Sequence, residues 1–129
     1  MPEKSAVRTE SAPAPFQGSP YSQAIKAGDL VFVSGQLGVT PDGTLVGGTI
    51  EEQTEQAFAN IRAILEAAGS SLDRIVKTTV YLTSLSNFAG MNDVYRRHVG
   101  DVPPARATVG ISELPSGAMI EIEVVALVR

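Results

Sequence analysis

The sequence has 129 residues, of which 43% are hydrophobic and 19% charged, and this fits one globular domain rather than a two-domain enzyme. It has no cysteine and one histidine, which excludes disulfides, thiolate nucleophiles and multi-histidine metal centres, although counting alone leaves an all-carboxylate site open. We predict no metal and no cofactor. The net charge of −4 argues against a large nucleic-acid-binding surface.

The N-terminal residues 1–19 are rich in proline, serine and alanine. They lack the apolar core of a signal peptide or a membrane span. We therefore expect a poorly ordered tail followed by a single domain over residues 20–129, in a cytoplasmic protein that does not bind a membrane.

Two short extended runs follow, at residues 21–27 and 30–35, and the sequence Ala27-Gly28-Asp29 between them is typical of a turn. They predict a β-hairpin. Residues 30–33 are apolar on both faces, which indicates a central strand covered on both sides.

The clearest helix begins after Thr49, which forms a capping-box pattern with Glu52, and it ends at Gly69. Apolar residues recur between these limits at helical spacing. The apolar stripe that they form should pack on a sheet.

Residues 75–82 are rich in β-branched side chains and predict a strand, and residues 86–98 predict a second helix. On this helix we expect an inward face made of Phe88, Met91, Asn92 and Tyr95.

Residues 106–111 and 118–128 predict the last two strands, which gives the order ββ(β)αβαββ. This order implies an α+β sandwich, in which both helices cover one face of a mixed sheet. The last strand is apolar on one side, yet its other side is also too apolar for plain exposure to solvent. We expect that other side to be buried against further subunits; it consists of Met119, Glu121, Glu123, Val125 and Leu127.

Two kinds of charged group could carry chemistry. Glu121 and Glu123 are two residues apart on one strand, so their side chains leave the same face about 7 Å apart, a spacing at which one could be protonated. Spacing alone equally fits two solvated carboxylates. Arg106 opens a strand after two prolines, and its planar fork suits a carboxylate ligand, although it could also be an ordinary surface arginine.

Uncharged groups are less informative. Ser34 and Gly35 end a buried strand, where a glycine permits close approach of a ligand or only tight packing. Tyr21 could fill the core or line a pocket mouth. We expect His98 to be a solvated residue at a helix end, so a serine hydrolase has weak support.

Six short segments, taken in order and spacing, resemble the RidA/YjgF family over nearly everything after residue 19. These segments are Gly18-Ser19-Pro20-Tyr21-Ser22-Gln23, Val33-Ser34-Gly35-Gln36, Val76-Lys77-Thr78-Thr79-Val80-Tyr81-Leu82, Asn92-Asp93-Val94-Tyr95, Pro104-Ala105-Arg106 and Ile120-Glu121-Ile122-Glu123.

The resemblance implies a chorismate-mutase-like fold and a homotrimer with three clefts between adjacent subunits. It also implies an enamine/imine deaminase that hydrolyses 2-imino acids such as 2-iminopropanoate and 2-iminobutanoate to 2-keto acids and ammonia. Arg106 would hold the substrate carboxylate, while Glu121 would position and polarise water. The other positions that the resemblance assigns to the cleft are Tyr21, Ser34, Gly35, Asn92 and Thr108.

Thr108 stands where many members of that family carry cysteine, but the resemblance assigns that position mainly a backbone contact. Three alternatives remain: a trimer that binds 2-keto acids without turnover, a ribonuclease, and a chaperone-like protein. Glu121 argues against a pure anion binder, because a carboxylate beside the ligand would repel it. The acidic composition argues against RNA binding.

Overall fold

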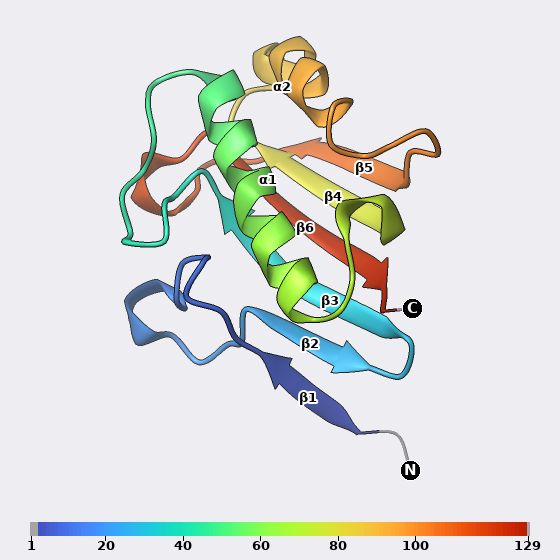
Figure 1. Ribbon diagram of the computed structural model, residues 1–129. Helices are drawn as coiled ribbons and strands as arrows, with labels where there is room; N and C mark the ends of the chain where they lie inside the picture. Colours follow the sequence, from blue (N-terminus) through green and yellow to red (C-terminus); the bar gives the residue numbers. More distant parts are fainter. Residues whose placement is uncertain (1–2, 129) are drawn as a thin grey trace.

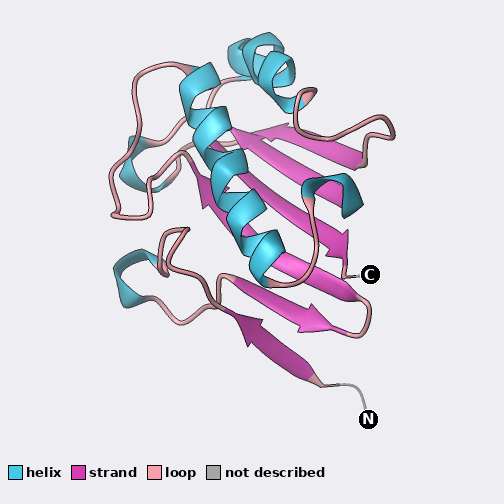
Figure 2. Ribbon diagram, viewed as in Figure 1, coloured by secondary structure: helices cyan, strands magenta, loops and turns pink. Residues whose placement is uncertain are grey.

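The computed structural model describes residues 3–128, which form a six-stranded mixed sheet with two helices on one face (Figures 1 and 2). Along the chain, the elements are β1 (Lys4–Val7), β2 (Ala24–Ala27), β3 (Leu30–Leu37), α1 (Ile50–Ala67), β4 (Ile75–Leu82), α2 (Phe88–Tyr95), β5 (Ala105–Gly110) and β6 (Ile120–Leu127). The strand order is β1-β2-β3-β6-β4-β5, and only β4 and β5 pair in parallel. The predicted α+β fold is confirmed.

The predicted hairpin is formed by β2 and β3, which pair antiparallel. The second strand continues to Leu37, and its pairing with β6 shifts between Val33 and Gln36. This bulge interrupts the ladder where Ser34 and Gly35 lie, and the pairing resumes at Gln36.

Helix α1 has the predicted ends. The Glu52 N–H donates to the Thr49 hydroxyl oxygen at 3.1 Å, and the Thr49 N–H donates to the Glu52 carboxylate at 3.3 Å, which completes the capping box. Gly69 has a φ of 85°, a left-handed conformation that favours glycine, and the chain leaves the helix there.

The core lies between the sheet and α1, which crosses the sheet in Figure 1. The alternation predicted for β6 is confirmed, because its buried residues face this core and the intervening ones do not. The buried residues of β6 are Ile120, Ile122, Val124 and Ala126.

The expectation of a poorly ordered tail is wrong for most of that segment, although Met1 and Pro2 lie outside the described residues. β1 extends the sheet by pairing with β2, and Val7 and Ala12 are buried. The Gln23 side chain donates to the carbonyls of Thr9, Ala12 and Pro13 and accepts from the Thr9 N–H. These bonds join residues 10 to 14 positions apart, so local composition does not reveal them.

The second helix is shorter than predicted at both ends, because a 3-10 helix at Leu85–Asn87 precedes it and residues 96–98 form turns. Met91 and Tyr95 face inward as expected, whereas Phe88 is 41% exposed. The prediction of a solvated His98 is wrong. Its ring stacks on Phe58, with 4.7 Å between centroids, and Nε2 lies 2.7 Å from a carboxylate oxygen of Glu55.

Candidate functional site

Arg106 lies on the face of the sheet that the helices cover. Its register partner on β4 is Thr78, whose buried hydroxyl bonds to that of Tyr95 on α2. The Arg106 guanidinium lies over the Tyr95 ring at 4.6 Å and over the Phe88 ring at 5.5 Å. Its Nη1 also donates to Asn92 Oδ1 at 2.8 Å.

This arginine is oriented but not neutralised. Within residues 3–128, no carboxylate forms an ion pair with the Arg106 guanidinium. A guanidinium has five N–H donors, and the bond to Asn92 occupies one of them. The remaining donors suit bidentate binding of a carboxylate. Because the Asn92 side-chain oxygen accepts from Arg106, Asn92 holds the arginine in place.

Glu121 lies on the opposite, helix-free face. On β6 it alternates with the buried Ile120 and Ile122, and it pairs with Leu37 and Tyr81. Its carboxylate covers Gly35 so closely that a Cβ added at Gly35 would overlap it. The glycine therefore provides the space that Glu121 occupies.

The two strand carboxylates have different environments. Burial raises the pKa of Glu121, and the neighbouring charge of Glu123 raises it further. Glu123 is exposed and accepts a hydrogen bond from the Tyr81 hydroxyl at 2.7 Å. That bond is the main reason why the pKa of Tyr81 is raised. Glu121 is thus a partly buried carboxyl group with a raised pKa, a combination that suits proton transfer.

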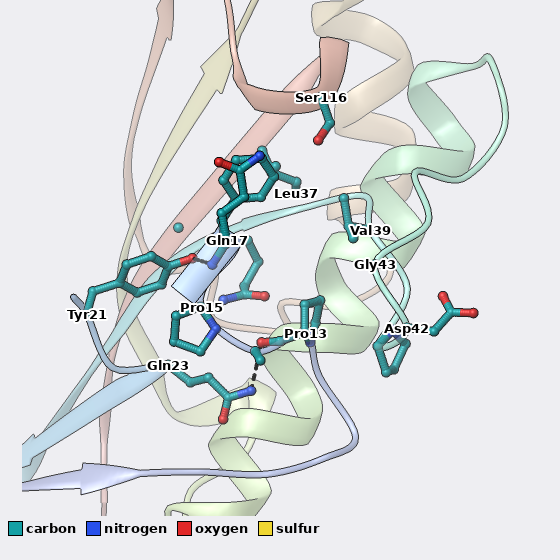
Figure 3. Close-up of a pocket in the computed structure, with 15 residues that line it drawn as sticks. Pro13, Pro15, Gln17, Tyr21, Gln23, Leu37, Val39, Asp42, Gly43 and Ser116 are labelled. Atoms are coloured by element: carbon teal, nitrogen blue, oxygen red, sulfur yellow. Dashed lines mark hydrogen bonds between the residues drawn. The ribbon is translucent and has the colours of Figure 1, made fainter. Parts of the chain in front are cut away.

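Tyr21 and Gly35 line one pocket of about 360 Å³ (Figure 3). The Tyr21 oxygen accepts a hydrogen bond from the Phe16 N–H at 2.7 Å, so the phenol keeps its own proton to donate. The Ser34 hydroxyl donates to the Ser22 carbonyl at 2.6 Å.

The predicted site residues therefore form two groups. The arginine group consists of Arg106, Asn92 and Thr108, and Thr108 shares the face of Arg106 because it pairs with the buried Val80. The glutamate group consists of Tyr21, Ser34, Gly35 and Glu121. Arg106 and Glu121 point to opposite faces of the sheet, so one chain does not bring them together.

Sequence reasoning missed Tyr95 and Phe88 as neighbours of Arg106. The signal was available in the helix periodicity, because positions 88, 91, 92 and 95 share one face of α2. The periodicity did not indicate that this face of α2 packs against β5.

In the described part of the chain, no cluster of three or more acidic or histidine side chains could hold a metal ion. No helix there combines the length and apolarity needed to cross a membrane.

Several known proteins are similar to this chain in sequence or in structure. The family model described as endoribonuclease L-PSP matches residues 9–128. A RutC family protein of Pyrococcus horikoshii is 49% identical over 124 residues, which span 95% of this chain and 97% of that protein. Reactive Intermediate Deaminase A, a chloroplastic protein of Arabidopsis thaliana, is 45% identical over 96% of this chain and 66% of its own length.

The solved structure of RidA from the Antarctic bacterium Psychrobacter sp. PAMC 21119 has the same fold, with a TM-score of 0.91 and 44% identity. The match covers 95% of this chain and 98% of that one.

Proposed function

Because the chain belongs to the RidA/YjgF family, we propose that it is an enamine/imine deaminase that hydrolyses 2-imino acids to 2-keto acids and ammonia. 2-Iminopropanoate and 2-iminobutanoate are the proposed substrates. The observation that carries the proposal is Arg106, a half-buried guanidinium oriented by Asn92 and Tyr95 that has free donors for a carboxylate.

The division of the site between two faces supports a homotrimer. The arginine group of one subunit would meet the glutamate group of its neighbour in a cleft between them. The helix-free face of the sheet is apolar enough for such an interface, with Phe32 45% and Leu127 39% exposed in the single chain. The active site is then incomplete until two copies associate.

In the proposed reaction, Arg106 binds the substrate carboxylate through two parallel hydrogen bonds and fixes the C=N carbon beside a water molecule. The Glu121 carboxylate takes a proton from that water while the water oxygen attacks the imine carbon, and the Glu121 carboxyl group then passes this proton to the nitrogen. In the resulting carbinolamine, Glu121 moves the hydroxyl proton to the amino group in the same way. Collapse of the tetrahedral adduct breaks the C–N bond, forms the keto group and releases ammonia. The Tyr21 hydroxyl, whose proton is not used within the chain, donates a hydrogen bond to the oxygen of the adduct.

A binding protein for 2-keto acids without turnover is the second candidate, since Arg106 alone suffices to capture a carboxylate. Glu121 favours the enzyme. A half-buried carboxylate next to an anionic ligand weakens binding, yet it is the base that water addition needs. The family model carries an endoribonuclease name, but the net charge of −4 does not favour RNA as the ligand. We propose a cytoplasmic location.

The proposal predicts the behaviour of Arg106 variants. 2-Imino acids generated in situ by an amino-acid oxidase, with semicarbazide trapping the remainder, would report the rate of hydrolysis. We expect both Arg106→Ala and Arg106→Lys to fall near the uncatalysed rate, because lysine keeps the charge but loses the planar fork. Arg62→Ala, at an exposed position on α1, is the matched control and should retain parental activity. A folded Arg106→Ala protein with the parental rate would refute the proposed site.

A further inference from the structure

We infer that Tyr95 is a positioning residue that holds the Arg106 guanidinium in one orientation, and that Thr78 fixes the tyrosine in turn. The kinetic consequence of this inference rests on the proposed function, whereas its structural consequence does not. No step of the deaminase reaction requires Tyr95 or Thr78 to touch the substrate.

The Tyr95 ring is fixed by contacts on several sides. Tyr95 is only 6% exposed, and its ring meets that of Phe58 edge to face, with centroids 5.6 Å apart. The Arg106 guanidinium lies 4.6 Å from the Tyr95 ring centroid. A cation gains electrostatic stabilisation over an aromatic face, and this gain grows where water is excluded. The immobile ring thus offers the guanidinium a single preferred place.

The Tyr95 hydroxyl is held in place by a hydrogen bond with the Thr78 hydroxyl. The two oxygens are 2.7 Å apart in a buried contact, and Thr78 is fully buried. A phenylalanine opposite a valine would fill nearly the same space without any buried hydroxyl group. Unlike that apolar pair, the hydrogen bond fixes the position of the Tyr95 hydroxyl relative to β4. Since β4 pairs directly with β5, the same strand fixes both the ring and Arg106.

The Asn92 bond alone does not fix the guanidinium plane. Nη1 donates to Asn92 Oδ1 and makes a long contact of 4.0 Å with Met91 Sδ, so both contacts anchor the same corner and leave the group free to rotate about it. An aromatic face beneath the group removes that rotation. Together the bond to Asn92 and the Tyr95 face, with the more distant Phe88 ring at 5.5 Å, set the direction of the remaining donors. Bidentate capture of a carboxylate depends on this direction.

Three substitutions separate the parts of the inference: Tyr95→Phe removes the hydroxyl, Thr78→Val removes its partner, and Tyr95→Leu removes the ring. Thr54→Val is the matched control, because Thr54 is equally buried but its hydroxyl donates to the Ile50 carbonyl within α1. We expect KM for 2-iminobutanoate and Kd for 2-oxobutanoate to rise about threefold in the first two variants and about tenfold or more in Tyr95→Leu.

The split between KM and kcat tests positioning against plain stability. A merely structural role would lower the amount of folded enzyme, and thus the apparent kcat, at constant KM and Kd. Unchanged KM and Kd in all three variants would overturn the inference. So would a rise of the same size in Thr54→Val.

A measurement without turnover distinguishes this inference from the proposed function. In nitrogen-15 relaxation experiments, the Arg106 Nε–Hε signal, assigned by its loss in Arg106→Lys, should report an ordered side chain in the parent. It should report a mobile one in Tyr95→Leu, even if the parent hydrolyses no imine. An equally ordered signal in Tyr95→Leu overturns the inference, whatever the activity of the protein.

Discussion

Gly35 is a glycine because the Glu121 carboxylate occupies the place where its side chain would be. Gly35→Ala should therefore displace Glu121 and lower kcat by about 10²-fold, as small misplacements of catalytic groups do. Gly48→Ala is the control, since nothing lies within 4 Å of a Cβ added there. Steady-state kinetics together with thermal melting would check this, and a folded Gly35→Ala enzyme with parental kcat would show that the close contact has no role in catalysis.

The pH dependence of hydrolysis should report the environment of Glu121. In the proposed reaction Glu121 acts as a base only when ionised, so kcat/KM should fall as the pH drops through its pKa. Because burial and Glu123 raise that pKa, the acid limb should lie above the ordinary glutamate value of about 4.3.

Glu123→Gln removes the smaller of these two causes. It should shift the acid limb to lower pH and leave the plateau rate nearly unchanged, whereas Glu121→Gln should abolish the activity at the plateau. The pH profiles of the parent and both variants are the measurement. If the acid limb of the profile lay at the same pH in Glu123→Gln as in the parent, the two carboxylates would not interact.

At the scale of elements, the sequence predicted the features that depend on residues close together in the chain. The capping box, the apolar stripe and Gly69 lie within one stretch of chain, so the limits of α1 follow from its sequence. The alternation of β6 likewise identified which of its residues face the core. β1 was missed because its four residues gain their place only by pairing with β2.

The candidate site was predictable to a similar extent. Arg106 and Glu121 could be identified from their motifs. The alternation of side chains along β6 indicated that Glu121 and Glu123 share one face of the strand. The face of Arg106 could not be derived, because it depends on the register of β5 against β4 and on the packing of α2. Both involve contacts between segments that are distant in sequence.

Gln23 explains how the N-terminal segment is held, and this can be tested. Gln23→Leu removes bonds to Thr9, Ala12 and Pro13 and leaves backbone groups without partners, so we expect a loss of about 1–3 kcal/mol in unfolding free energy. Urea denaturation would measure it. Trypsin should also cut faster after the exposed Arg8 if residues 4–13 detach locally.

Ser86→Ala is the control for that experiment. Its hydroxyl bonds only to the Ser84 hydroxyl and both residues are exposed, so water can replace the bond and the loss should stay below about 0.5 kcal/mol. Equal stability losses for the two substitutions, or unchanged cleavage after Arg8, would contradict the role assigned to Gln23.

For the whole molecule, the main consequence is that neither face of the sheet holds a complete site. The proposed cyclic trimer would bring the arginine group of each subunit against the glutamate group of the next, whereas a monomer could not do so. The apolar side chains on the helix-free face would be buried in the same association. Assembly and catalysis should therefore depend on each other.

Mixing two inactive variants tests this arrangement directly. A chain with Arg106→Ala keeps its glutamate group, and a chain with Glu121→Gln keeps its arginine group, so a mixed trimer has one intact site of three. Random assembly of equal amounts should restore about a quarter of the parental activity, because about three quarters of the trimers contain both kinds of chain. Co-expression followed by the imine-trapping assay would measure it. Arg106→Ala mixed with Arg106→Lys is the control and should stay inactive, since both changes affect the arginine group. If the first mixture formed trimers and yet stayed as inactive as its two components, the site would have to lie within a single chain.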